Sequence, residues 1–171
     1  MAGCKGYSRL LWKQKFVMNI EEMSGGVLEV LLVNAEGLKH ARLSGSRRHV
    51  VIECGAHTIA SKFTTAEDGK AWWNEKFSFN LSHLDLKKLR RMRLRIVGQD
   101  KLFEHHHIGE ATIHLMDIIK EGHHRGKIEI KPTSYNVVLE DQTYKGEIKV
   151  GLKFTSGVSP LKLVQEFIFY E

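Results

Sequence analysis

The densest group of chemically active side chains in this sequence is the basic run Lys87-Lys88-Leu89-Arg90-Arg91-Met92-Arg93-Leu94-Arg95-Ile96. If residues 91–97 form a β-strand, alternate side chains point to opposite faces of the sheet. The side chains that face a core are then Met92, Leu94 and Ile96, and those on the outer surface are Arg91, Arg93 and Arg95. Guanidinium groups bind phosphate oxygens in pairs of hydrogen bonds, so the outer row predicts an anion-binding surface. The alternative is a solvated face whose arginines pair with acids across the strands.

A second basic group flanks the turn signal Ser44-Gly45-Ser46. Arg42 precedes this turn, and Arg47 and Arg48 follow it. Guanidinium groups at one turn would attract phosphate as the strand arginines do. A solvated basic loop without a ligand is an equally good interpretation of these residues. Lys62 is a further basic residue, in a candidate strand at residues 58–63.

Histidines form the group that comes nearest to a metal site. His105-His106-His107 is expected in one loop and His40 in another, with Asp100 close in sequence. Imidazole and carboxylate groups are zinc ligands. Consecutive side chains diverge, however, so at most two of the three adjacent histidines can reach one ion, and we predict no metal site. Protonation of the cluster near about pH 6 is a second hypothesis, because it would add charge to a basic region.

Motifs of catalysis are lacking. The sequence contains no nucleophile elbow, no phosphate-cradling glycine-rich loop, and no HExxH or CxxC motif. We therefore predict a protein that is not an enzyme, that requires no cofactor and that has no small-molecule substrate.

The scaffold for these side chains is predicted to consist of short β-strands from Val27 onward. Runs of β-branched and aromatic residues are separated by turn signals such as Asp68-Gly69. Many short strands at fairly even spacing, with one helical segment near residues 115–121, indicate an antiparallel sandwich or barrel. The candidate strands are 27–33, 49–54, 58–63, 76–81, 91–97, 110–114, 135–139 and 147–154.

Composition and length fit one domain in the cytosol. The 171 residues carry a formal net charge of +6 and a pI of about 9.3, which favours anionic partners without choosing between lipids and nucleic acid. No apolar stretch approaches the roughly 20 residues that span a bilayer. No secretory signal is recognisable at the start, and Cys54 lies in an apolar run, as a buried reduced thiol would. Residues 1–26 and 156–171 are expected to be extensions of the domain, the first of them poorly ordered.

Three segments together resemble a C2 domain. Residues 26–38 (GVLEVLLVNAEGL) are similar to the opening strand and its turn, residues 73–79 (WNEKFSF) to the W-N-E-x-F-x-F signature, and residues 108–113 (IGEATI) to the strand after the third calcium loop. Residues 135–139 and 144–151 are similar to small plant proteins with a single C2 domain, the elicitor-responsive and sixteen-kilodalton phloem-protein group.

The resemblance implies an all-β fold: an eight-stranded antiparallel C2 β-sandwich with Greek-key connections, type II strand order and one short helix in a connection. The C2 domain would span residues 27–155. Within the signature, Phe77 and Phe79 should point at the core, and Trp73 should belong to the core. Trp72 should face the other way, next to a loop.

The same resemblance implies that the calcium site is degenerate. Carried over by motif, the calcium-ligand positions fall on Arg42, Arg48, Gly98, Asp100 and His106, so Asp100 alone keeps a carboxylate. Calcium takes roughly six to eight oxygen ligands. A guanidinium about 4 Å away repels a divalent cation by roughly 4 kcal/mol per unit charge at an effective dielectric of about 20. We therefore expect no calcium binding.

These observations predict a cytoplasmic, calcium-independent C2 module that associates peripherally with anionic phospholipids of the plasma membrane in plant defence or stress signalling. Its binding residues would be Lys62, Arg91, Arg93, Arg95, Arg42, Arg47 and Arg48. An RNA-binding protein of the phloem type and a protein-interaction adaptor are the alternatives. The first of these rests on resemblance alone, since no platform of exposed aromatic residues is evident.

Overall fold

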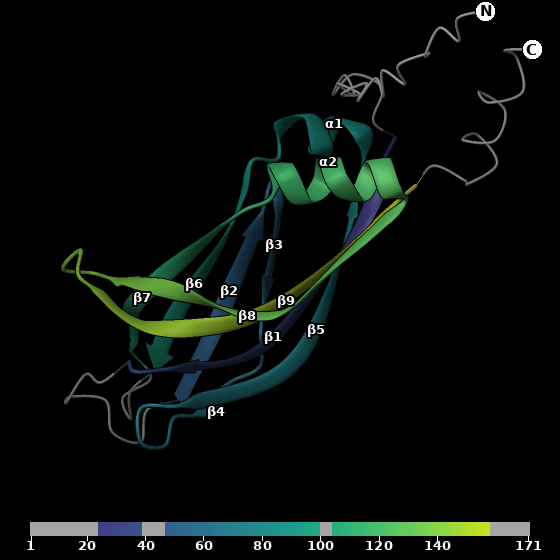
Figure 1. Cartoon of the computed structure of the whole chain (residues 1–171). Helices are drawn as coiled ribbons and strands as arrows, with labels where there is room; N and C mark the ends of the chain where they lie inside the picture. Colours follow the sequence, from purple (N-terminus) through teal and green to yellow (C-terminus); the bar gives the residue numbers. More distant parts are fainter. Residues whose placement is uncertain (1–23, 39–46, 100–103, 158–171) are drawn as a thin grey trace, which may run out of the picture.

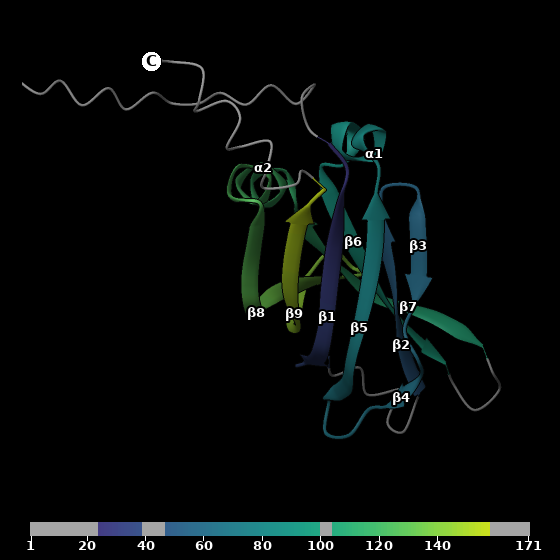
Figure 2. The same ribbon diagram turned by 90° about the vertical axis from the view of Figure 1, so that its right-hand side faces the viewer.

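The computed structural model describes residues 24–38, 47–99 and 104–157, which form two stacked β-layers with a pair of helices at one end (Figure 1). The strands hydrogen-bond in the order β3-β2-β6-β7-β8-β9-β1-β5, and β4 pairs with β2 off this path. The first four strands of this order form one layer and the last four form the other. In Figure 2, β8, β9, β1 and β5 lie side by side. The antiparallel all-β sandwich predicted from the sequence is confirmed.

All eight candidate strands exist, and β4 is a short additional one. The strands are β1 (Gly26–Glu36), β2 (Arg47–Cys54), β3 (His57–Ala60), β4 (Thr64–Thr65), β5 (Ala71–Leu81), β6 (Arg91–Gln99), β7 (His105–His114), β8 (Lys127–Leu139) and β9 (Tyr144–Ser156). The two layers join where Gly109 of β7 pairs with Leu139 of β8. A Cβ atom at Gly109 would lie 2.7 Å from the Val138 carbonyl oxygen, so only glycine lets the strands meet here.

The core lies between the layers and follows the period-2 pattern of the strands. On β6, Met92, Leu94 and Ile96 are fully buried, as the alternation predicts. They face buried residues of the second layer such as Leu28 and Val30 of β1. Burial of each such side chain stabilises the fold by roughly 1.5–3 kcal/mol. The alternation of β6 therefore fixes which of its side chains remain on the outside.

Strand β5 contains the aromatic signature and a bulge. Phe79 is buried, and Phe77 and Trp73 pack against the core, as expected. The register against β1 shifts between the pairs Leu32–Glu75 and Asn34–Trp72. Asn74, which lies within this shift, adopts a left-handed φ of 50°. Asparagine tolerates this conformation better than most residues. Alternation along β5 places Trp72 on the outer face, and the register shift makes it the partner of Asn34.

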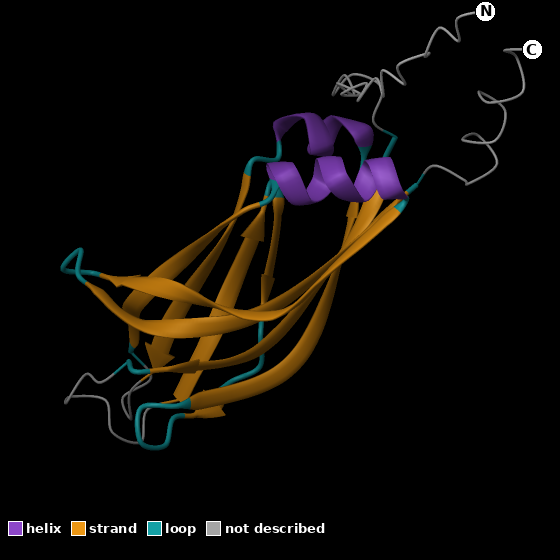
Figure 3. Cartoon of the chain, viewed as in Figure 1, coloured by secondary structure: helices purple, strands orange, loops and turns teal. Residues whose placement is uncertain are grey.

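Two helices occupy the end of the sandwich opposite β4 (Figure 3). Helix α2 (Met116–Arg125) is the helix predicted near residues 115–121. Helix α1 (His83–Lys88) was not predicted, so the expectation of one short helix was wrong. Its start is fixed by a capping box, in which the Ser82 hydroxyl accepts from the Asp85 backbone N–H while the Asp85 carboxylate accepts from the Ser82 backbone N–H. With 6 and 10 residues, these helices are too short to cross a bilayer, and the described residues contain no longer one.

The strand order is the type II order that the sequence analysis expected. The first strand, β1, is central in its layer and pairs with β5 on one side and with the last strand, β9, on the other. With the short β4 left aside, β1 thus lies between the fourth strand and the last strand, which is the type II arrangement; in the type I arrangement the first strand lies between the second strand and the last. Strand order depends on pairing between distant segments, so the resemblance to C2 domains predicted it and local sequence patterns did not.

Cys54 is fully buried, as predicted from its apolar surroundings. Burial raises the pKa of its thiol to about 12, so the thiolate is suppressed. Both predicted extensions fall almost entirely outside the described residues, and so does Cys4. The boundaries at residues 27 and 155 stay a prediction.

Candidate functional site

Charged residues of the first layer gather on its outer face, which we call the arginine face. Its members are the four arginines Arg47, Arg91, Arg93 and Arg95 and the two acids Glu53 and Glu110. The strand alternation places them there. The β6 arginines alternate with the fully buried residues of the same strand. The acids come from the flanking strands, because β2 and β7 pair with β6 on either side.

Two of the three β6 arginines are ion-paired. The Arg93 Nε atom lies 3.1 Å from one Glu53 carboxylate oxygen, and Arg95 Nη2 lies 2.6 Å from the other. A Glu110 oxygen lies 4.0 Å from Arg93 Nη1. The alternative interpretation, pairing with acids across strands, is therefore correct for Arg93 and Arg95. Two arginines and two carboxylates leave the middle of the face close to neutral.

The unpaired positive charge lies toward the two ends of the face. Arg91 is exposed, and it has no ion pair within the described residues. At the opposite end, the guanidinium carbon of Arg47 lies 4.7 Å from the centre of the Phe63 ring, in a cation–π arrangement. Lys62 is exposed just beyond β3, and its backbone N–H donates to the Glu75 carboxylate. Arg47, Lys62 and Arg91 are thus the cations of the predicted set best placed to receive an anion.

An aromatic and imidazole cluster adjoins Arg47. The His49 ring lies 4.5 Å from the Phe63 ring and 5.8 Å from the His105 ring. Burial lowers the pKa of His49, and the neighbouring His105 lowers it further. Sequence analysis did not identify this cluster, because Phe63 and His105 are distant in the chain and meet only through the pairing of β2 with β6 and of β6 with β7.

Arg48 is not the surface residue that sequence analysis expected. It belongs to β2, where alternation turns it inward, and it is only 3% exposed. Its Nη2 atom donates to the Leu38 carbonyl oxygen at 3.4 Å, while Nε and Nη1 have no partner among the described residues. Burial lowers the pKa of its guanidinium. Arg47, by contrast, is exposed as expected, although it too lies in β2 and not in a loop.

The other degenerate calcium positions divide between described and undescribed residues. Gly98 of β6 is the register partner of Arg48, and His106 of β7 is in turn the partner of Gly98. Arg42 and Asp100 lie outside the described residues, as does His40. Within the described ranges, no group of three or more His, Cys, Asp or Glu side chains is arranged to hold a metal ion.

The three adjacent histidines lie in strand β7 and not in a loop, which corrects the expected location. Their strand conformation places His105 and His107 on one side of the ladder and His106 on the other. His105 and His107 therefore share the arginine face with His49.

Two acids that shape the arginine face were missed in the sequence. Glu53 was visible as the one charged residue in the run Val50-Val51-Ile52-Glu53-Cys54, at an outward position. Its contact with two arginines depends on the register of β2 against β6, which the sequence does not state. Glu110 was missed for the same reason.

Comparison with known proteins gives consistent matches. A family model described as "C2 domain" matches residues 26–130. Elicitor-responsive protein 3 from Oryza sativa subsp. japonica is 37% identical, and the match covers 78% of this chain and 85% of that protein. The 16 kDa phloem protein 1 from Arabidopsis thaliana is 27% identical, with 78% of this chain and 86% of that protein covered.

Solved structures agree with these matches. A C2 domain-containing protein from a putative elicitor-responsive gene superposes with a TM-score of 0.63 at 33% identity, covering 81% of this chain and 93% of that one. The C2A domain of plant extended synaptotagmin 1 has a TM-score of 0.61 at 17% identity, covers 80% of this chain and 98% of that one, and shares the fold.

Proposed function

The chain belongs to the C2-domain family, and within it we propose a module that binds anionic phospholipid surfaces without calcium. Neither this family nor the elicitor-responsive and phloem relatives are enzyme families. The proposal places the protein in the cytoplasm, peripherally attached to the plasma membrane, with no catalytic role. By its relatives, its setting would be plant defence or stress responses.

Arg48 is the observation that carries the calcium-independent part of the proposal. The resemblance assigns this position a calcium ligand, and here a buried guanidinium occupies it, with two of its nitrogens lacking a partner in the described part of the chain. A buried positive charge repels a cation more strongly than a solvated one, because the local dielectric is lower. The Arg48 guanidinium therefore supplies the positive charge that a bound calcium ion would supply in a calcium-binding C2 domain.

The arginine face supports the anionic-lipid part. Arg91 and Arg47 are exposed cations at its two ends, and Lys62 adds a third. Each Lys or Arg near an anionic leaflet contributes about 1 kcal/mol of attraction. The Glu53 pairs hold Arg93 and Arg95 in fixed orientations, so phosphate oxygens that displace the carboxylate would meet preoriented donors.

RNA binding is the weaker candidate on structural grounds. Binding of single strands uses neighbouring aromatic side chains on which successive bases stack. Among the described residues, the most exposed aromatic side chains are on separate surfaces: Phe63 by the arginine face, Trp72 on the opposite layer and Tyr144 at the start of β9. An adaptor role would leave the exposed cations of the arginine face without a ligand.

Co-sedimentation with vesicles tests the proposal. The full chain should bind phosphatidylcholine vesicles that contain phosphatidylserine or a phosphoinositide, and the bound fraction should be the same with calcium and with a chelator. Binding should weaken as salt rises, because exposed charges are screened. An RNA competitor should displace the protein poorly at equal phosphate concentration.

Two results would count against this function. Loss of vesicle binding on addition of the chelator would refute the calcium-independent part. Absence of binding to every anionic vesicle, together with tight RNA binding, would favour the phloem-type alternative.

A further inference from the structure

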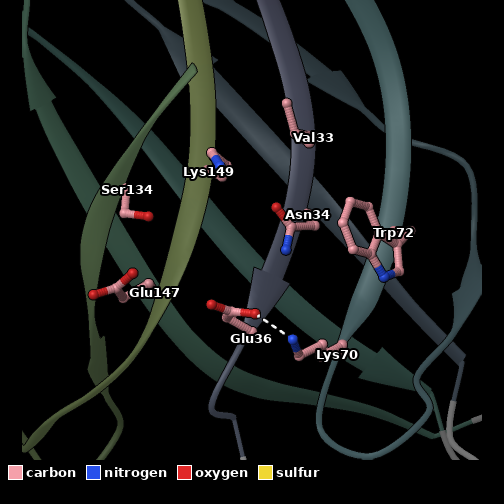
Figure 4. A pocket seen from close by; sticks show the side chains of 8 residues that line it. All are labelled: Val33, Asn34, Glu36, Lys70, Trp72, Ser134, Glu147 and Lys149. Atoms are coloured by element: carbon pink, nitrogen blue, oxygen red, sulfur yellow. Dashed lines mark ion pairs between the residues drawn. The ribbon is translucent and has the colours of Figure 1, made fainter.

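The bulges in β1 and β5 create a pocket on the outer face of the second layer, away from the arginine face. The register of β1 shifts between Leu32 and Asn34 against both of its neighbours. As a result Asn34 faces outward, with Trp72 of β5 and Lys149 of β9 as its partners on either side. We call this space the bulge pocket; it is lined by Val33, Asn34, Glu36, Lys70, Trp72, Ser134, Glu147 and Lys149 (Figure 4).

Asn34 forms the floor of the bulge pocket and has an unused acceptor. The residue is only 5% exposed, and no described group donates to its Oδ1 atom. In Figure 4 the carboxamide lies between Lys149 and Trp72. A buried carbonyl oxygen without a donor is unfavourable, so the site favours a ligand that brings an N–H group.

The rim of the bulge pocket carries both signs of charge and one aromatic wall. Glu36 and Glu147 provide carboxylates, and Lys149 provides an ammonium group. Lys70 lies 2.9 Å from Glu36 in an ion pair. Trp72 is 54% exposed, so an indole face is accessible to a ligand. With two acids and two lysines, the lining is formally neutral.

This combination matches a small zwitterion. A cation is attracted to the Trp72 ring and to the carboxylates, and an anion is attracted to Lys149. The volume of the pocket, about 170 Å³, is below the roughly 300–1,000 Å³ of pockets for drug-sized ligands. The N–H requirement of Asn34 selects a primary ammonium over a quaternary one, because a trimethylammonium group has no proton to donate.

We propose that the bulge pocket binds a phosphoethanolamine group, with its ammonium donating to Asn34 Oδ1 beside Trp72 and Glu147 and its phosphate on Lys149. The same group occurs as a free phosphomonoester and as the headgroup of a phospholipid. This site is separate from the arginine face, and its ligand is not an anionic lipid.

Titration of the ¹⁵N-labelled full chain with O-phosphoethanolamine tests the site, with the Trp72 indole N–H signal as the probe. We expect saturable shifts of this signal, and about tenfold weaker binding of phosphocholine, which lacks the N–H groups. Inorganic phosphate should leave the Trp72 signal in place. Equal affinity for phosphoethanolamine and phosphocholine, or no shift at all, would overturn the proposal.

Variants locate the binding. Lys149→Ala should weaken phosphoethanolamine binding about tenfold, as expected for loss of a charge-assisted contact. Trp72→Ala, followed through backbone signals of β1, should weaken it similarly. Both side chains are exposed, so we expect both variants to fold. Lys120→Ala, on helix α2 outside the pocket, is the matched control and should bind as the unchanged chain does. Unchanged affinity in both pocket variants would refute the assignment.

Vesicles distinguish the two sources of the ligand. Sedimentation with phosphatidylcholine vesicles that contain phosphatidylethanolamine, but not with phosphatidylcholine alone, would assign the lipid headgroup. Binding of soluble phosphoethanolamine without such sedimentation would assign the free phosphomonoester. These vesicles carry no net charge, so failure of the anionic-lipid proposal would leave this result unaffected, and the reverse also holds.

Discussion

The two outer faces of the sandwich carry charge in different ways. On the second layer, lysines and acids are paired individually: Lys153 with Glu29, Lys127 with Glu129 and Lys70 with Glu36. We call it the lysine–glutamate face. On the arginine face, one carboxylate, that of Glu53, serves two arginines, and other cations stand apart.

The net charge of +6 does not show how charge is distributed between the two faces. The lysine–glutamate face pairs part of its charges, and Lys76, Lys131 and Lys149 have no ion pair among the described residues. In its closest pair, the Glu29 contact raises the pKa of Lys153, and the Lys153 contact lowers the pKa of Glu29. The arginine face keeps a surplus of guanidinium groups, which bind phosphate with better geometry than ammonium groups. An anionic surface should therefore discriminate between the two faces.

Charge reversal on each face should give the largest difference. Because each basic residue contributes about 1 kcal/mol near an anionic leaflet, Arg47→Glu combined with Arg91→Glu should weaken binding to phosphatidylserine vesicles at least about 30-fold. Lys76→Glu combined with Lys131→Glu on the lysine–glutamate face is the matched control and should have a small effect. Equal losses in the two double variants would show that net charge, and not the arginine face, drives binding.

Replacing Arg48 should change stability in the opposite direction to most core substitutions. Arg48 carries a buried charge that has no carboxylate partner within residues 24–38, 47–99 and 104–157. Removing this charge relieves its desolvation, so Arg48→Met should stabilise the fold by about 1–4 kcal/mol in urea denaturation. Arg48→Lys, which keeps the charge, should give no such gain. A marked loss of stability in Arg48→Met would mean that the guanidinium is satisfied in solution by an anion.

Neutralising the shared acid should strengthen binding. Glu53→Gln frees Arg93 and Arg95 and removes one negative charge, so vesicle affinity should rise about fivefold, the equivalent of about 1 kcal/mol. The stability change should stay within about 1 kcal/mol, because the pairs are partly exposed. Glu129→Gln, on the other face, serves as the comparison. Weaker binding by Glu53→Gln would show that the fixed orientation of the arginines matters more than their charge.

Acidification should produce the smallest effect, which is a change in the stability of the fold. The folded-state pKa of His49 lies below its ordinary value of 6.5, because burial and His105 disfavour the imidazolium. The unfolded chain then takes up the proton first, so stability falls as pH drops through about 6.5 toward 5.5. Thermal melting across this range should show a decrease in Tm, and His49→Gln should flatten it. A Tm that rises on acidification would contradict this sign.

Local patterns located the elements well, and the reasons are visible in single strands. The alternation in β6 predicted both its buried and its exposed residues correctly, because burial on one face of a strand imposes a period of two. Helix α1 was missed although its signal, Ser82 with Asp85 three positions later, is present. A helix of 6 residues has too few apolar positions to show a periodicity.

The site was less predictable because it depends on register. Which acid stands beside Arg93 follows from how β2 aligns with β6, and a shift of one residue would have turned Glu53 inward. The inward position of Arg48 depends in the same way on where β2 begins. The bulge pocket depends on two register shifts. Their one local indication in the sequence was the asparagine of the W-N-E motif, a residue type that tolerates the left-handed conformation found at Asn74.

The adjacency of β1 and β9 makes this sandwich a natural candidate for circular permutation. The backbone N–H of Gly157 donates to the Gly25 carbonyl at 2.7 Å, so a short linker could close the chain there. The closed chain could be reopened in the connection between β8 and β9 without interrupting any described strand. Such a permutant would begin at β9 and end with β8, and it would have the type I connectivity while every buried contact stayed in place.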